Sequence, residues 1–469
     1  MKGTVKMIRT FIEEHSEDML GSISELVRIP SVMGDAQEGA PFGKECVRAL
    51  HKALEIAEGM GFSVRDIDNY AGTAEYIPDG ADGIGLAILC HLDVVPAGDG
   101  WSFPPFEMTR ADGKIIGRGV IDDKGPAMAA LYGLYAVKEL NIPLKKGVRI
   151  VFGTNEENGS EDLEYYLKKE TLPENVFTPD GSFPVINVEK GMIRSKFKGS
   201  YVPDNDDIFI SVKGGTVANA VPEKAEAVVK AEYLQAVKTA AESDGSGAVF
   251  TFADNSDGTV TVTSRGRSAH ASTPESGINA VTALLDLLVS ASHKETEAVK
   301  LIKGLTEIFP FGETDGSSAG LKCADDVSGA LTCVFSLFEM KHGRADGTAD
   351  VRFPVCTCLE NVRRTEEAAF AKAGCEFDSF MGDEPHCVDE NSDFIRTLLR
   401  VFEKHTGLKG ECIAIGGGTY VHNINGGVAF GAELGSTDYH MHGADEFFPV
   451  SELIADAAIY GDAISEICG

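Results

Sequence analysis

The sequence predicts an α/β domain with a central, mostly parallel sheet, interrupted by an inserted α+β domain. Buried strand-like runs at 84–90 and 148–153 alternate with helical stretches, which is the pattern of a parallel sheet. From about residue 193, short strand-like runs separated by turn residues replace this alternation, and it returns near residue 390. The expected domains are 1–190 (first part), 191–385 (insertion) and 386–469 (second part).

Periodicity places the individual elements. Apolar residues at helical spacing, ended by Ile29-Pro30 in the first stretch and Gly61 in the second, predict helices. These are expected at 4–28, 43–60, 124–140, 277–291, 294–308, 393–406 and 450–467. Strands are expected at 84–90, 148–153, 208–212, 225–228, 248–252, 260–262, 332–340, 348–353 and 412–415.

Composition excludes several classes of partner. The net charge of −31 argues against a nucleic-acid or anionic-membrane partner, because both need a basic footprint. The N-terminal stretch 1–18 has no apolar core of a signal peptide, and no apolar run is long enough to cross a bilayer. The ten cysteines are scattered, which is typical of reduced thiols in a cytoplasmic protein.

Five short stretches are rich in residues that bind metal ions. They contain His91 and Asp93, Asp122, Glu156 and Glu157, Asp180 and, near the C-terminus, His442. Histidine and carboxylate ligands spread over several loops are how a two-metal hydrolytic site is built. Each stretch alone has a structural explanation, such as a helix N-cap or a turn.

The stretches occur in a recognisable order. They read His91-Leu92-Asp93, Gly-x-x-Asp122-Asp123-Lys-Gly-Pro, Asn-Glu156-Glu157-Asn-Gly-Ser, Pro-Asp180-Gly-Ser-Phe-Pro and His442-Gly-Ala-Asp-Glu446. With this order the chain resembles the metallopeptidase family of carboxypeptidase G, aminoacylase, desuccinylase and carnosinase type enzymes. The resemblance is strongest to bacterial PepV-type dipeptidases and covers nearly the whole chain. It implies a zinc-peptidase-like catalytic domain with an inserted lid domain.

The resemblance also implies the role of each residue. Asp122 would bridge two metal ions, with His91 and Asp180 on one and Glu157 and His442 on the other. Glu156 would be the general base, and Asp93 would orient His91. His440 competes with His442, but only His442 has a Glu four residues later. The Asp122–Asp123 peptide bond would be cis.

The insertion carries its own candidates. His270, in Ser268-Ala-His-Ala-Ser-Thr-Pro274, resembles the lid histidine that stabilises the oxyanion. Asn219 and Arg352 match substrate-binding positions, and the guanidinium fork of Arg352 would suit a substrate carboxylate. In this family a glycine segment such as Gly417-Gly418 borders the substrate.

The function expected from this resemblance is hydrolysis of dipeptides with a free C-terminal carboxylate. A metal-bound hydroxide would attack the peptide bond, with two divalent ions per chain. Zinc is the expected ion, and manganese and cobalt are alternatives. The other function left open is an N-acyl-amino-acid deacylase or desuccinylase with the same metal site. The long insertion favours the dipeptidase and a monomer, because relatives with a shorter lid use it to dimerise.

Overall fold

The computed structural model describes residues 2–435 and 437–469, with only the backbone of Lys2. The chain divides into two compact units. Unit 1 comprises Met1–Asn187, Val388–Ile413 and Gly418–Gly469, and unit 2 comprises Val188–Cys387 and Ala414–Gly417. The chain first passes from unit 1 to unit 2 between residues 187 and 188, three residues before the expected domain boundary at 190/191. It returns to unit 1 between residues 387 and 388, two residues after the expected boundary at 385/386. The assignment of Ala414–Gly417 to unit 2 is not expected from the sequence.

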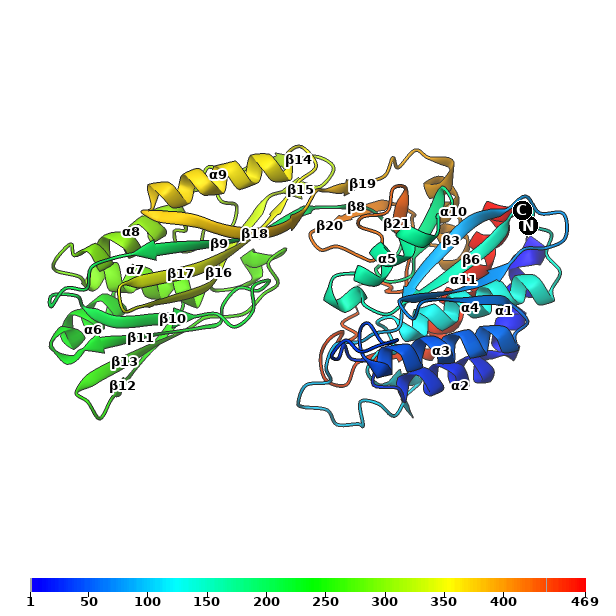
Figure 1. Cartoon of the computed structure of the whole chain (residues 1–469), viewed down its shortest axis with the longest axis horizontal. Helices are drawn as coiled ribbons and strands as arrows, with labels where there is room; N and C mark the ends of the chain where they lie inside the picture. Colours follow the sequence, from blue (N-terminus) through cyan, green and yellow to red (C-terminus); the bar gives the residue numbers. More distant parts are fainter. Residues whose placement is uncertain (1, 436) are drawn as a thin grey trace. The chain divides into compact units, whose positions relative to one another are not determined.

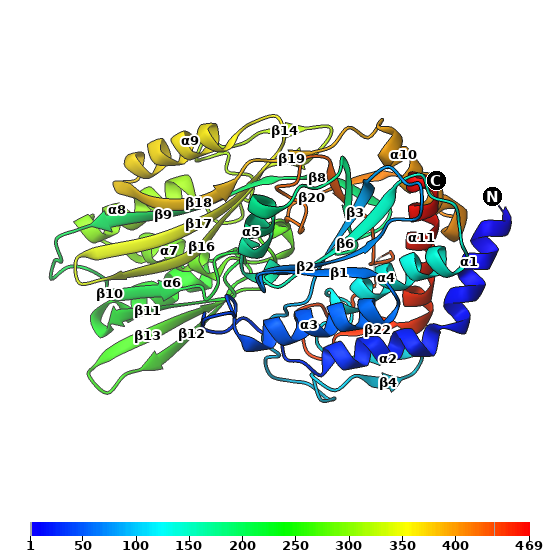
Figure 2. The same ribbon diagram turned by 45° about the vertical axis from the view of Figure 1, so that its right-hand side comes forward.

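Unit 1 is built around one mixed sheet, whose strands run in colour from blue (β1) through cyan (β6) to orange (β21) in Figures 1 and 2. The strand order is β1-β2-β6-β3-β7-β21-β8, in which β6, β3, β7 and β21 are mutually parallel and the outer pairings are antiparallel. The strands are β1 Ser63–Ile67, β2 Ala71–Tyr76, β3 Ile84–His91, β6 Gly147–Gly153, β7 Asn175–Thr178, β8 Val185–Glu189 and β21 Gly427–Ala429. A smaller antiparallel sheet contains β4 Thr109–Ala111, β5 Lys114–Ile116 and β22 Phe447–Pro449.

Helices cover both faces of the unit 1 sheet. Side chains that alternate along β3 go to different cores, as the two-residue period of a strand requires. Leu86 and Ile88 join the large core with α4 and α11, whereas Ala87 and Leu89 pack with α5. The helices are α1 Lys2–Glu14, α2 Ser16–Val27, α3 Lys44–Gly59, α4 Lys124–Glu139, α5 Glu161–Lys169, α10 Asp393–Thr406 and α11 Val450–Cys468. The layers therefore form an α/β/α sandwich with buried parallel strands.

Unit 2 contains an eight-stranded antiparallel sheet with helices on one face (Figure 1). Its order is β12-β13-β11-β10-β16-β17-β9-β18. The strands are β9 Gly191–Ser200, β10 Phe209–Gly214, β11 Lys224–Lys230, β12 Val249–Asp254, β13 Thr259–Arg265, β16 Thr332–Lys341, β17 Arg344–Phe353 and β18 Cys375–Asp383, with a hairpin β14 Ala324–Asp325 and β15 Gly329–Ala330. The helices are α6 Leu234–Glu242, α7 Ala280–Ala291, α8 Glu297–Ile308 and α9 Leu359–Lys372. Ile193 and Phe197 of β9 face these helices, whereas Arg194 and Lys196 lie on the other face.

The passages of the chain between the units at 187/188 and 387/388 run side by side. Strand β8 pairs with β19 (His386–Cys387) through Glu189 with His386 and Val188 with Cys387. On the unit 1 side, Val388 N donates to Asn187 O at 2.9 Å. The strand β20 (Cys412–Ile415) also pairs with β8. Unit 2 is therefore an insertion whose two ends are neighbours.

Most expected elements are present, but the first helix differs and several further elements were not expected, among them α6, β1, β2, β9 and β18. The single helix expected at 4–28 is two helices, since the chain breaks at His15, whose ring Nδ1 is 2.8 Å from Phe11 O. Helix α9 was not expected, because its exposed faces are highly charged and only Val362, Glu366, Ala369 and Phe370 are buried. Among the described residues, no helix combines the length and apolar character needed to span a bilayer.

Candidate metal centre

The candidate ligands of unit 1 come from the ends of its central strands. His91 is the last residue of β3, Glu156 and Glu157 begin the 3₁₀ turn η1 (Glu156–Asn158) after β6, and Asp180 follows β7. These three strands are parallel neighbours, so their carboxyl ends meet at one edge of the sheet. Asp122 lies directly before the Asp123 N-cap of α4. The fold therefore gathers residues that are far apart in the sequence.

Two groups of potential ligand atoms share Asp122. One group is His91, Asp122 and Asp180, and the other is Asp122, Glu157 and His442, with all ligand atoms of a group within 4.8 Å of one another. His91 Nε2 is 2.9 Å from Asp122 Oδ1 and 3.7 Å from Asp180 Oδ2. His442 Nε2 is 2.8 Å from Asp122 Oδ2 and 3.3 Å from Glu157 Oε2. The two oxygens of one carboxylate thus face two separate groups.

His442, and not His440, belongs to this arrangement. Both residues have a left-handed backbone, with φ of 59° and 57°. The ring of His440 lies edge-on against Phe447, with ring centroids 5.6 Å apart. His440 is in neither ligand group, and of these two histidines His442 is the one whose ring reaches the Asp122 carboxylate.

Asp93 holds the site in two ways, and only one was expected. The His91 ring Nδ1 lies 3.1 Å from the main-chain oxygen of Asp93 and 3.5 Å from its Oδ1. The carboxylate oxygens instead accept from the backbone N–H groups of Glu156 and Glu157, each at 3.1 Å. The side chain of Asp93 therefore caps the turn that presents both glutamates, while its carbonyl fixes the tautomer of His91.

The loop that carries Asp122 is tied to the C-terminal segment by Glu446. This buried carboxylate accepts from Arg118 Nη1 at 2.5 Å and from the backbone N–H groups of Gly119 and Ile121 at 2.9 and 3.1 Å. The Asp122–Asp123 peptide bond is cis, as the resemblance implies. Glu446 lies four residues after His442, so one segment both supplies His442 and braces the Asp122 loop.

Three more buried groups support the ligands and were missed in the sequence. Asp123 Oδ2 accepts from His91 N at 3.1 Å, and Lys124 Nζ donates to the carbonyls of Leu26 and Ile29. Asp162 Oδ2 accepts from Thr154 N, Asn155 N and the Tyr420 hydroxyl. Asp162 is one of three acidic residues in the first turn of α5, and backbone hydrogen bonds leave no pattern in the sequence that would distinguish it.

The centre holds an excess of negative charge. Burial, and then the nearby charges of Asp180, Asp122 and Glu157, raise the pKa of Glu156 well above its usual value, although His91 opposes the shift. Burial and then the Asp122 charge raise the pKa of Asp180 to about 7. Hydrogen bonds to Asp122 and then Glu157 raise the pKa of His442 to about 10. Glu156 and Asp180 therefore resist ionisation and His442 resists deprotonation. The carboxyl of Asp122 differs: although burial opposes the shift, hydrogen bonds with His442 and then His91 lower its pKa.

The donor set fits divalent metal ions. His91 Nε2 and Glu157 Oε1 are buried and make no hydrogen bond within the described residues. Because His91 Nδ1 faces a carbonyl oxygen, Nε2 is the ring nitrogen that faces the two carboxylates. A divalent cation between these atoms would take the place of the Nε2 proton. Nitrogen and oxygen donors without thiolate suit zinc, manganese or cobalt.

Two candidates in unit 2 lie on adjoining loops. Ala220 and His270 form an isolated bridge, and Ala271 N donates to Asn219 O at 2.9 Å. The ring Nδ1 of His270 is 2.7 Å from Ser272 Oγ. Burial and then the positive charge of Arg352 lower the pKa of His270. His270 is therefore a neutral imidazole near a positive group.

Arg352 joins this second set through the glycine segment. Its Nη1 donates to Gly416 O at 3.1 Å. A Cβ on Gly416 would lie 2.5 Å from the Cβ of Ser272, so only glycine permits this approach. Nothing lies within 4 Å of the Cβ position of Gly417, whereas Gly418 is exposed and belongs to unit 1. Unit 2 thus brings Arg352, Gly416 and the His270 loop together.

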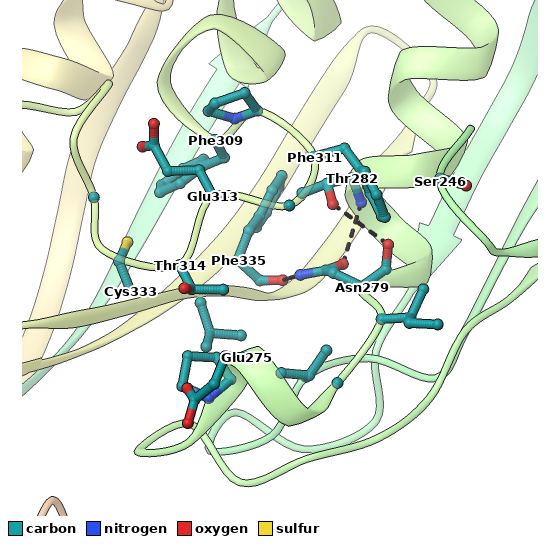
Figure 3. Close-up of a pocket in the computed structure, with 18 of the residues that line it drawn as sticks. Ser246, Glu275, Asn279, Thr282, Phe309, Phe311, Glu313, Thr314, Cys333 and Phe335 are labelled. Carbon is teal, nitrogen blue, oxygen red and sulfur yellow. Dashed lines mark hydrogen bonds between the residues drawn. The ribbon is translucent and has the colours of Figure 1, made fainter. Parts of the chain in front are cut away.

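A cavity of about 330 Å³ lies within unit 2, beside the turn that contains Pro274 and Glu275 (Figure 3). Phe309, Phe311 and Phe335 line it, and Asn279 donates to Phe335 O at 2.9 Å across its side. Val221 and Pro274, from the loops of Asn219 and His270, form another wall. The His270 loop packs through the small cluster Val221, Ala271 and Val334, so it rests on few apolar contacts.

Comparison with known proteins places this geometry in a family. Residues 87–466 match Peptidase family M20/M25/M40. The Beta-Ala-Xaa dipeptidase of Lactobacillus delbrueckii subsp. lactis is 36% identical over 477 residues, covering 97% of both chains. The protein YtjP of Bacillus subtilis (strain 168) is 35% identical over 464 residues, covering 96% of this chain and 97% of its own.

Solved structures agree in fold at lower identity. The M20 family metallo-carboxypeptidase Sso-CP2 from Sulfolobus solfataricus superposes with a TM-score of 0.59 at 18% identity, covering 96% of this chain and 99% of its own. Human carnosine dipeptidase 1 gives a TM-score of 0.57 at 16% identity, covering 99% of each chain. The chain therefore belongs to peptidase family M20/M25/M40 and is a hydrolase of the metallopeptidase class.

Proposed function

We propose that this chain is a dipeptidase that uses two divalent metal ions. The single observation that carries the proposal is the pair of ligand groups, each with one histidine, that share the Asp122 carboxylate. His91 and Asp180 would complete one ion, and Glu157 and His442 the other. The dipeptidase name of the Lactobacillus relative, with near-complete coverage at 36% identity, supports the choice of substrate.

The chain's own residues have separate roles in this proposal. Two bound ions would polarise the peptide carbonyl and lower the pKa of the attacking water. Glu156, held by its backbone N–H on Asp93, would take the proton of that water and pass it to the leaving amine. The raised pKa of Glu156 suits a group that must both accept and release a proton.

Zinc is the proposed metal, and a hydrolysis screen tests the function. Protein reconstituted separately with zinc, manganese and cobalt is assayed on dipeptides, tripeptides and N-acyl amino acids. Turnover of dipeptides above the other classes supports the proposal, and the most active metal identifies the ion. Preference for N-acyl amino acids would instead favour the deacylase alternative.

The proposed location is the cytoplasm. The scattered cysteines support it, since they are typical of reduced thiols.

His270 is the proposed oxyanion donor. Its neutral ring can donate one hydrogen bond, which would strengthen as charge develops on the substrate oxygen. We expect His270→Ala to lower kcat by on the order of 10²–10³, the usual cost of one such donor. Steady-state kinetics decide this, because a change confined to KM would make His270 a binding residue.

Arg352 is proposed to measure substrate length by gripping the C-terminal carboxylate. A third residue would move that carboxylate by about 3.5 Å. We expect dipeptides to be cleaved and tripeptides largely spared, and Arg352→Ala to erase the difference through a large rise in KM for dipeptides. Equal kcat/KM on dipeptides and tripeptides would refute the length rule.

We also propose that the protein is a monomer. Analytical ultracentrifugation tests this, and a stable dimer would refute it.

A further inference from the structure

A buried aspartate lies between two arginines on the sheet of unit 2. Asp350 on β17 is 0% exposed. Its Oδ1 accepts from Arg352 Nε at 2.6 Å and its Oδ2 from Arg352 Nη2 at 3.2 Å. The same Oδ2 accepts from Arg194 Nε at 2.7 Å, across the register pair Arg194–Asp350 of β9 and β17. One carboxylate thus serves two guanidinium groups.

These contacts leave one edge of Arg352 available. A guanidinium has five N–H groups in a fixed fork. Asp350 takes the Nε–H and one N–H of Nη2, and Gly416 O takes one N–H of Nη1. One N–H remains on each terminal nitrogen, so Arg352 keeps two donors for a carboxylate. Asp350 therefore determines which edge of Arg352 can meet a ligand.

The cluster also has a defined charge. Arg194 and Arg352 contribute +2 and Asp350 contributes −1. His270, whose pKa is lowered by burial and by Arg352, adds none near neutral pH. The sum is +1, which one carboxylate neutralises. A second carboxylate on the same ligand would meet no remaining positive charge in the cluster, and the charge of Asp350 would repel it.

We propose that Asp350 is a positioning and specificity-determining residue that orients Arg352 and limits the substrate to one carboxylate near its C-terminus. The inference rests on the proposed function, in which Arg352 binds the substrate's C-terminal carboxylate. It names a narrower substrate class, peptides whose C-terminal residue has an uncharged side chain.

The test compares Leu-Asn with Leu-Asp, which differ in the charge of one side chain. The metal-loaded wild-type enzyme should prefer Leu-Asn. Asp350→Asn should raise KM for Leu-Asn by about 10- to 100-fold, because Arg352 is no longer held, with kcat changed much less. The cluster charge becomes +2, so the preference for Leu-Asn over Leu-Asp should fall by about tenfold.

A matched control lies on the same strand. Asp346 also binds an arginine two residues away, with Arg344 Nε and Nη2 both at 2.7 Å, but this pair is exposed. Asp346→Asn should leave both KM and the Leu-Asn preference unchanged. An equal loss in Asp346→Asn and Asp350→Asn would overturn the proposal.

A substitution of Arg194 separates the effect of the cluster's net charge from the effect of orienting Arg352. Arg194→Met keeps the Asp350–Arg352 pair and makes the cluster neutral, so the Leu-Asn preference should increase. In Asp350→Asn/Arg194→Met the charge returns to +1, so the preference should return towards wild type while KM stays high. If Asp350→Asn does not fold, Arg194→Met alone decides, and an unchanged preference overturns the proposal.

Failure of the proposed function would be recognised separately. An enzyme that cleaves N-acyl amino acids and not dipeptides would refute the dipeptidase activity. The comparison would then use N-acetylasparagine and N-acetylaspartate, which present the same C-terminal residues. Unequal responses of these two substrates to Asp350→Asn would support the role of Asp350, and equal responses would overturn it.

Discussion

Replacing Glu156 with glutamine is expected to lower kcat by about 10²–10⁴-fold, the contribution of a positioned general base. The amide has nearly the shape of the carboxyl but cannot accept the proton of the attacking water. Glu156 is in neither ligand group, so both metal ions should remain bound. Steady-state kinetics and elemental analysis on the same preparation check both parts.

Glu157→Gln is the matched control, since the two glutamates are neighbours in one turn and both donate their backbone N–H to Asp93. Glu157 belongs to the second ligand group, so its replacement should reduce the metal content. The assignment of the base is wrong if Glu156→Gln stays active, or if it loses metal as Glu157→Gln does.

Asp122→Ala is also expected to cause a large loss of metal binding and activity, because Asp122 is the residue that the two ligand groups share. Without it, His91 and His442 lose the carboxylate that each faces at 2.9 and 2.8 Å. Metal content should fall below one ion per chain, and kcat/KM should fall by more than about 10³-fold.

Asp180→Ala provides the comparison, since Asp180 is in one group only. It should lose one ion and keep the other, as measured by elemental analysis after dialysis. Adding metal back should restore chelator-treated wild-type protein but not Asp122→Ala. Retention of two ions by Asp122→Ala would refute a bridging role for this carboxylate.

The types of the candidate ligands and their positions at strand ends could be predicted from the sequence, because both depend on residues that are close together in the chain. Buried runs ending at His91 and Gly153 are visible as apolar stretches, and the parallel arrangement follows from strand–helix alternation. His442 is 320 residues from Asp122, so spacing alone could not pair them. The family resemblance, and not periodicity, supplied that link.

The backbone hydrogen bonds of the supporting carboxylates could not be predicted, although Asp93 and Glu446 lie in stretches that carry the family resemblance. Asp93, Asp162 and Glu446 act by accepting from backbone N–H groups. Every non-proline residue has that donor, so the partner leaves no trace in the sequence. Asp350 differs from these residues, because the sequence itself shows that it stands two residues before Arg352. Its burial and its contact with Arg194 appear only when β9 and β17 pair.

The insertion of unit 2 has a consequence for synthesis on the ribosome. The residues Val188–Cys387 separate two parts of unit 1, and at about 5–20 residues per second their translation takes on the order of 10–40 s. During that time β3, β6 and β7 exist without β21, and α4 lacks α11, the helix it packs against. His442 emerges last of the candidate ligands. A nascent chain therefore cannot assemble both ligand groups until the segment that contains His442 has left the ribosome.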